Sequence, residues 1–164
     1  MQRILNDLGR GRDELPVVQH VMFRAWQTAK ARADQTPGPA PVRISVADYV
    51  AVGGFKDALS NHADEALRKF KGRERIVEQV FCSLGQRGAS GRWIRRPCSL
   101  RQLAEESGYA EADVMAVVEE FRRPERCFLM PPFDRALTSD SVIDVSHESL
   151  LRQWVRLKEW ITNE

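Results

Sequence analysis

The most informative stretch of the chain is Val142-Ile-Asp-Val-Ser-His-Glu-Ser-Leu-Leu-Arg-Gln-Trp-Val-Arg-Leu-Lys-Glu-Trp160. Its first four residues alternate, with Ile143 and Val145 on one side, as expected of a short β-strand. Further along, apolar side chains recur at helical spacing and form a single stripe. The stripe consists of Leu150, Leu151, Trp154, Leu157 and Ile161. The change of period predicts a strand followed by one helix over residues 147–162.

His147 stands where the predicted strand ends and the helix begins. The first amides of a helix have no internal partner and the dipole is positive there, so this turn is a candidate site for an anion such as phosphate. A histidine at such a junction is more often a cap or a packed, hydrogen-bonded residue. The local pattern leaves both interpretations open.

Size and composition set broad limits. The 164 residues suffice for one domain or two small ones, and 43% hydrophobic with 29% charged residues is typical of a soluble globular protein. A net charge of +2, with both signs mixed, gives no strong field for nucleic acid or an anionic membrane. No apolar run approaches the roughly 20 residues of a membrane span, and no signal peptide is evident. We therefore expect a cytoplasmic protein without membrane contact.

The cysteines and histidines do not predict a metal site or a disulfide framework. Both groups are scattered, and neither has the spacing of zinc ligands. They are Cys82, Cys98 and Cys127, with His20, His62 and His147. We expect reduced thiols and no metal.

The first half of the chain reads as a small, all-helical domain, residues 1–71. An N-terminal piece containing Leu5 and Leu8 resembles a start inside a larger element, so we expect the chain to be a portion of a longer protein. Asp13 can cap a helix with Pro16 in its first turn, running to about Ala33. Its expected inward face is Leu15, Val18, Met22 (or His20), Phe23 and Trp26.

A linker at 34–41 is expected to follow that helix. Ser45 then caps a short helix, Val46 to Val52, which Gly53 and Gly54 end. A further helix begins at Phe55 and reaches Phe70, and we expect His62 at a solvated or boundary position on it.

The second half, residues 72–164, reads as a winged helix, a helix-turn-helix with a β wing, plus the C-terminal helix. Helices are expected at Arg73–Leu84, Leu100–Glu106 and Glu111–Arg123, and strands at Cys127–Met130 and Ser141–Val145. Residues 85–91 are expected to be a loop, and Trp93–Cys98 an extended edge segment. That order is typical of a three-helix core with a wing. The predicted fold class is therefore mainly α, a helical domain followed by a winged helix.

A winged helix invites a DNA-binding interpretation, which the charge distribution opposes. The helix that would enter the major groove carries Glu111, Asp113, Glu119 and Glu120, and acidic groups facing phosphates lower affinity. Arg92, Arg95 and Arg96 form a basic edge that equally suits a solvated, protected strand. We expect no DNA binding. A winged-helix DNA-binding transcriptional regulator using this edge remains the alternative, and a protein-interaction module anchored by Trp93 or Trp160 a third.

No catalytic residues can be assigned. The chain contains no Gly-x-x-x-x-Gly-Lys-Ser/Thr phosphate loop, no Gly-x-Ser-x-Gly elbow and no His-Glu-x-x-His motif. We therefore expect that this chain alone is not an enzyme.

Three segments in order resemble one known family. They are Asp13-Glu-Leu-Pro-Val-Val-Gln-His20 with Phe23-Arg-Ala-Trp26, then Ile44-Ser-Val-Ala-Asp-Tyr-Val-Ala-Val-Gly-Gly54 with Ala58 and Leu59, then Val145-Ser-His-Glu-Ser-Leu-Leu-Arg-Gln-Trp154 with Arg156, Leu157 and Trp160. The chain resembles the region after the nucleotide-binding core of bacterial novel STAND NTPases, signal-transduction ATPases related to the NACHT and NB-ARC regulators. The resemblance covers nearly the whole chain.

The resemblance implies a regulatory, nucleotide-sensing role in signal transduction. In such proteins a helical domain and a winged helix fold over ATP or ADP, with Mg, held by an upstream core that carries the Walker A and Walker B elements. Pro16 is similar to the proline that lies against the base, and His147 to the histidine that contacts a phosphate of ADP and holds the closed, inactive state. Arg152 matches a family arginine that either contacts phosphate or pairs with an acid.

The same resemblance implies partners outside this chain. They are the upstream nucleotide-binding domain, a downstream sensor or repeat domain, and further copies on activation. Because the Walker elements are absent here, we expect the chain alone to hold no nucleotide tightly and to hydrolyse none, whereas the full-length parent is expected to be an ATPase.

Overall fold

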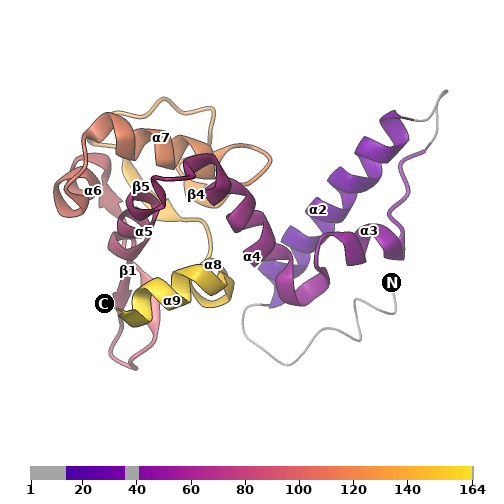
Figure 1. Ribbon diagram of the computed structural model, residues 1–164, viewed down its shortest axis with the longest axis horizontal. Coiled ribbons are helices and arrows are strands. Elements are labelled where there is room, and N and C mark those ends of the chain that lie inside the picture. Colours follow the sequence, from indigo (N-terminus) through magenta and orange to yellow (C-terminus); the bar gives the residue numbers. More distant parts are fainter. Residues whose placement is uncertain (1–13, 36–40, 164) are drawn as a thin grey trace. The chain divides into compact units, whose positions relative to one another are not determined.

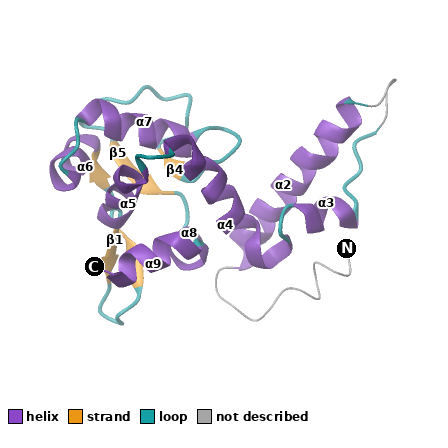
Figure 2. Cartoon of the chain, viewed as in Figure 1, coloured by secondary structure: helices purple, strands orange, loops and turns teal. Residues whose placement is uncertain are grey.

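The computed structural model describes residues 14–35 and 41–163, and within them the chain is mainly helical with short antiparallel strands (Figure 1, Figure 2). It divides into two compact units, Met1–Asn61 and His62–Glu164, which are described separately. The N-terminal piece with Leu5 and Leu8, the Asp13 cap and positions 36–40 of the expected linker lie outside the described residues.

The first unit contains α2 (Glu14–Asp34), α3 (Val46–Ala51) and the beginning of α4 (Gly54–Leu67). Figure 1 shows α3 lying beside α2, and the two helices are in contact. The buried side chains of α2 follow one another at every fourth position, which is one face of a helix. They are Val17, Val21, Ala25 and Ala29.

The predicted inward face of α2 is wrong at its two ends, whereas Val18, Met22 and Phe23 are half-buried. Leu15 is 68% exposed and Trp26 43%, although both were expected in the core. The pattern favoured the largest apolar side chains, whereas the helix buries small ones. Alanine at positions 25 and 29 lets a neighbouring backbone approach closely, which bulky residues would prevent.

Ser45 caps α3 as predicted. Its hydroxyl accepts from the Asp48 amide at 3.2 Å, and the Ser45 amide donates to Asp48 Oδ2 at 2.7 Å, which completes a capping box. Arg32 at the end of α2 donates to both carboxylate oxygens of Asp48, at 2.9 and 3.0 Å. The hydrogen bonds from Ser45, and then the nearby Arg32 charge, lower the pKa of Asp48. This clamp fixes the end of α2 to the start of α3.

The second unit is built on α5 (Glu74–Ser83), α6 (Leu100–Ser107) and α7 (Glu111–Arg122), which contact one another. It also contains the end of α4 and the 3₁₀ turn η1 (Arg68–Phe70). Ser99 caps α6 with the same box as Ser45, and Gly108 ends it in the left-handed region, φ 72°. The core between these helices consists of Ile76, Val77, Val80, Phe81, Leu103, Val114, Val117, Val118 and Phe121.

A three-stranded antiparallel sheet accompanies the helices, in the order β3-β5-β4. β3 (Cys98–Ser99) lies between α5 and α6 in sequence, yet it pairs with β5 (Val142–Val145), Cys98 opposite Ile143. β4 (Leu129–Met130) pairs with the other edge of β5, Leu129 opposite Val145. The two predicted strands are confirmed as a pair, and Ile143 and Val145 are buried as their alternation predicted.

The expectation of a loop at residues 85–91 is wrong for the first three residues and holds for residues 88–91. β1 (Gly85–Arg87) pairs with β2 (Trp93–Arg95) as a hairpin, Gly85 opposite Arg95. Glycine weakens strand propensity, and the sequence therefore gave no local sign of β1. Here it has a packing reason, because a Cβ on Gly85 would lie 2.7 Å from the Trp93 ring.

Arg122 fixes the beginning of the β4–β5 connection. It is buried, and its guanidinium pairs with both carboxylate oxygens of Glu119 on α7. The remaining nitrogen donates to the carbonyls of Pro131 and Pro132, at 3.3 and 2.6 Å. A buried charge is tolerated because these acceptors replace its hydration.

The single helix predicted over residues 147–162 is broken. α8 (Ser149–Gln153) and α9 (Val155–Asn163) are separated by Trp154, whose ψ of 109° is extended. Trp154 is fully buried, its ring lies edge-on to Phe81 at 5.0 Å, and its Nε1 donates to Asp64 Oδ1 at 2.8 Å. We attribute the break to these tertiary contacts, which override the local period. The predicted stripe is nevertheless buried at every position.

His62 is also placed differently from the expectation. It is 1% exposed, and its ring lies 5.1 Å from that of Phe128. The helical pattern left position 62 at the edge of the apolar face, and the aromatic neighbour, 66 residues away in sequence, could not be foreseen from it.

Candidate functional site

His147 lies between β5 and α8, as predicted, and is half-exposed. The Ser149 amide donates to its Nδ1 at 3.1 Å, and the Ser149 hydroxyl lies 2.9 Å from the same nitrogen. A backbone N–H aimed at Nδ1 requires a lone pair there, so the proton of the neutral ring is on Nε2. Within the described part of the chain, nothing hydrogen-bonds Nε2. The ring therefore presents one N–H donor.

The helix-dipole part of the phosphate hypothesis loses support from the structure. α8 spans only five residues before Trp154 breaks it, so few peptide dipoles are aligned behind His147. The donor that this turn offers an anion from a side chain is the imidazole N–H.

Arg152 is one helical turn beyond Glu148, on α8. Its guanidinium donates to Glu148 Oε2 at 2.5 Å, and both side chains are one-third exposed. Pairing with an acid was one of the two roles considered for this residue. Glu148 and Arg152 follow His147 closely in sequence. The turn therefore carries the imidazole N–H donor of His147 and an arginine whose charge is balanced by Glu148.

Pro16 belongs to the other unit. It is the third residue of α2, within the first turn, where its missing amide leaves no helical bond unmade. It is half-buried. His147 and Arg152 are thus brought together on one turn, whereas Pro16 is described only within Met1–Asn61.

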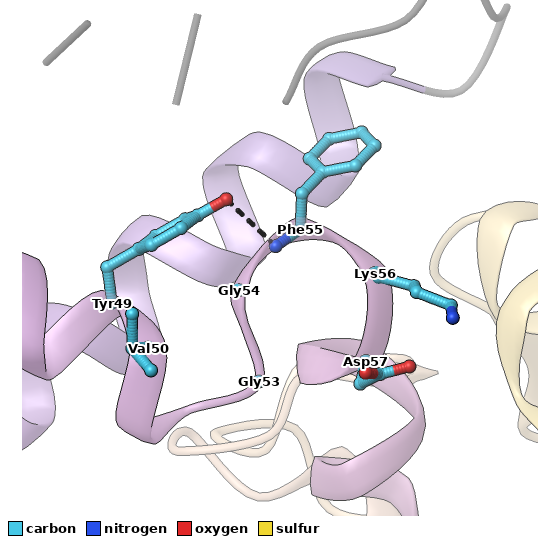
Figure 3. A pocket seen from close by; sticks show the side chains of 7 residues that line it. All are labelled: Tyr49, Val50, Gly53, Gly54, Phe55, Lys56 and Asp57. Carbon is cyan, nitrogen blue, oxygen red and sulfur yellow. Dashed lines mark hydrogen bonds between the residues drawn. The ribbon is translucent and has the colours of Figure 1, made fainter. Parts of the chain in front are cut away.

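The second resembling segment forms a pocket of about 460 Å³ that sequence reasoning missed (Figure 3). The buried Tyr49 hydroxyl accepts a hydrogen bond at 3.0 Å from the Phe55 amide, at the start of α4, across the Gly53–Gly54 turn. Both glycines have positive φ, 98° and 58°. No local pattern marks a tyrosine as the cap of a helix that begins five residues later.

The chemistry of this pocket is neutral. Its rim carries one cation, Lys56, and one carboxylate, Asp57, so their charges cancel. Val50 and Phe55 supply apolar surface beside them. The Gly53–Gly54 turn lies against the Tyr49 ring. A Cβ built on Gly54 would lie 3.4 Å from that ring, and this close contact shapes the pocket wall.

The basic edge is largely neutralised within the second unit. Arg95 donates to Asp144 at 3.0 Å and to the Val145 carbonyl. Arg96 binds both carboxylate oxygens of Glu106, and this hydrogen bonding lowers the pKa of Glu106. At the start of α7, Asp113 pairs with Arg73. Of the residues proposed as an anchor, Trp93 is half-buried, and so is Trp160, whose ring lies 5.3 Å from Trp154.

Two general properties bear on the site. In residues 14–35 and 41–163 no cluster of three or more His, Cys, Asp or Glu side chains is arranged to hold a metal ion. None of the helices described there combines the length and apolar character needed to cross a bilayer.

Comparison with known proteins gives one match. No curated protein and no solved structure matches the chain. The family model described as Novel STAND NTPase 1 matches residues 1–164, the entire chain. A match of that extent shows the family: the chain belongs to the novel STAND NTPase 1 family.

Proposed function

We propose that this chain is the regulatory, non-catalytic part of a STAND signal-transduction NTPase. In this proposal it closes over ADP or ATP held by a nucleotide-binding core on the same polypeptide, and it opens to permit self-association. The observation that carries the proposal is the turn at His147, whose Nε2–H is free of partners in the described part of the chain. Family membership supports the presence of a nucleotide for that donor to contact.

The arrangement of the second unit supports a winged helix. After α5 and the β1–β2 hairpin, the order β3, α6, α7, β4, β5, with β3 pairing to β5, is what a helix-turn-helix core carrying a β wing would have. We propose residues 72–164 as this domain and residues 1–71 as the helical domain, which would extend through α4 and η1 to the turn at Gly72.

A neutral imidazole is suited to reporting nucleotide state. Its N–H can donate to a phosphate oxygen without fixing a permanent cation in the closed state. A switch requires a contact made in one state only, since a ligand with equal affinity for both states shifts nothing. His147 meets this condition if the contact exists when the domains are closed and is lost when they open. Pro16 and Arg152 are proposed as further nucleotide contacts, Pro16 to the base and Arg152 after release from Glu148.

The proposal is tested in a polypeptide that contains the nucleotide-binding core. Removing the donor with His147→Ala should speed release of a fluorescent ADP analogue by about tenfold or more, the value of one hydrogen bond to a charged group. Basal output should rise as the closed state is lost. Gln153→Ala on the same helix serves as the matched control. Unchanged ADP release and unchanged basal output in the folded His147→Ala variant would overturn the role.

A further inference from the structure

The contacts around the candidate histidine single out a second residue. Ser149 is polar, yet only 1% of its surface is exposed. Buried polar groups in proteins are normally hydrogen-bonded. Its amide and its hydroxyl both lie within bonding distance of one atom, Nδ1 of His147, at 3.1 and 2.9 Å. A serine buried in this way holds the ring instead of facing a ligand.

The consequence is a fixed tautomer. Imidazole has two neutral forms, and only one of them leaves a lone pair on Nδ1 to receive the Ser149 amide. The other form would place an N–H at Nδ1 against that amide hydrogen. The ring is therefore held with its proton on Nε2, and its orientation is fixed by the contacts of the Ser149 amide and hydroxyl with Nδ1.

We infer that Ser149 is a positioning residue that holds the neutral form of the His147 ring in its Nε2–H tautomer and thereby restricts its ligand to a hydrogen-bond acceptor, such as a phosphate oxygen. The inference deepens the proposed function and rests on it for the identity of the ligand. In the opposite tautomer, Nε2 would direct a lone pair at the phosphate and repel it. Without the Ser149 hydroxyl, the backbone amide alone would favour the Nε2–H form, so the two forms would compete more evenly and the donor would be present for a smaller part of the time.

The tautomer can be measured in the 164-residue chain without nucleotide. Two-bond ¹H–¹⁵N correlation spectra distinguish Nδ1–H from Nε2–H, and His147→Gln identifies the His147 signals among those of His20 and His62. At a pH where the ring is neutral, we expect the Nε2–H pattern in the unmodified chain. Ser149→Ala should raise the Nδ1–H population, and Ser149→Thr, which keeps the hydroxyl, should restore the original pattern.

The functional arm uses the polypeptide with the nucleotide-binding core. Ser149→Ala should speed ADP release by roughly three- to tenfold, about the value of one hydrogen bond, because the backbone amide remains. Ser149→Thr should restore slow release. An Nδ1–H pattern in the unmodified chain, or spectra that are identical in the unmodified and Ser149→Ala chains, would overturn the inference whatever the nucleotide does. Normal ADP release in His147→Ala would instead overturn the proposed function and leave the tautomer result standing.

Discussion

His20 on α2 makes the stability of the first unit depend on pH. Burial, with the nearby Arg24 charge, lowers its pKa from 6.5 to about 4. Between these values the unfolded chain binds a proton that the folded chain does not, so the free energy of unfolding falls as the pH decreases from about 6.5 to about 4. The loss should be roughly 1–3 kcal/mol.

Thermal unfolding at pH 7 and pH 5 measures this effect. We expect His20→Gln to reduce the difference between the two melting temperatures. Asp48, whose pKa is lowered, titrates below this window and does not contribute to it. Equal pH dependence in the unmodified chain and in the variant would show that His20 is not the responsible group.

Replacement of Gly53 should be more damaging than replacement of Gly72. The φ of Gly53 is 98°, and a Cβ there would lie 3.0 Å from the Ala58 backbone nitrogen, which cannot move aside easily. Gly72 is a matched control, with φ 81° and open space around the added atom. We expect a cost of about 1 kcal/mol for Gly72→Ala and about 2–3 kcal/mol for Gly53→Ala, measured by urea denaturation. Similar costs at both positions would refute the steric argument.

Helix caps were the local features best predicted from sequence, because they depend on residues three apart. Ser45 caps α3 as expected, and Ser99 caps α6 with the same pattern. Ser45→Ala should lower stability by about 1 kcal/mol, since the Asp48 amide would lose its acceptor. Ser90→Ala, in the exposed turn of the β1–β2 hairpin, should have no measurable effect. A neutral result for Ser45→Ala would mean that the Arg32–Asp48 pair holds α3 unaided.

The junction of α8 and α9 tests the role of Trp154. Trp154→Phe removes the indole donor to Asp64 and leaves a cavity, so a loss of about 2–4 kcal/mol is expected. Asp64→Asn keeps an acceptor oxygen and loses only the exposed pairing with Arg156, at 3.4 Å, which should cost less than about 1 kcal/mol. If Asp64→Asn were as damaging as Trp154→Phe, the ion pair and not the indole bond would carry the junction.

The elements that sequence reasoning misplaced share one physical cause, which is dependence on distant partners. The helical spacing of apolar residues over 150–161 correctly predicted which side chains are buried. The break at Trp154, however, depends on contacts with Asp64 and Phe81. β1 exists because Trp93 and its neighbours pair with it. The turn at His147 was predicted from a local change of period, whereas the bonds from Ser149 that define its tautomer require coordinates.

The division into Met1–Asn61 and His62–Glu164 predicts separable unfolding. Effects of distant, independent sites on stability usually add. We therefore expect Ser45→Ala to lower the melting temperature of the first unit and Trp154→Phe that of the second. In the double variant, each shift should equal the shift seen in the single variant. Calorimetry of the 164-residue chain and its variants gives the result directly. A single transition moved by either substitution would mean that the units unfold together.

Nucleic-acid binding can be tested on the intact chain. Because Arg95 and Arg96 already pair with Asp144 and Glu106, most of the positive charge of this edge is neutralised and cannot displace counterions from DNA. Gel-shift titrations at two salt concentrations should show weak binding with a shallow salt dependence. Tight binding that falls steeply with salt would instead favour the transcriptional-regulator alternative.

Arg122 has a consequence for sequence divergence among relatives. It holds the connection after β4 through hydrogen bonds to the main-chain carbonyls of Pro131 and Pro132 and through a cation–π contact, its guanidinium carbon lying 5.3 Å from the centre of the Phe133 ring. Main-chain acceptors are supplied by any amino acid. The two hydrogen bonds can therefore survive a change of side chain at positions 131 and 132 over evolutionary time, whereas the contact at position 133 needs an aromatic ring, provided that the arginine and its acidic companion Glu119 persist.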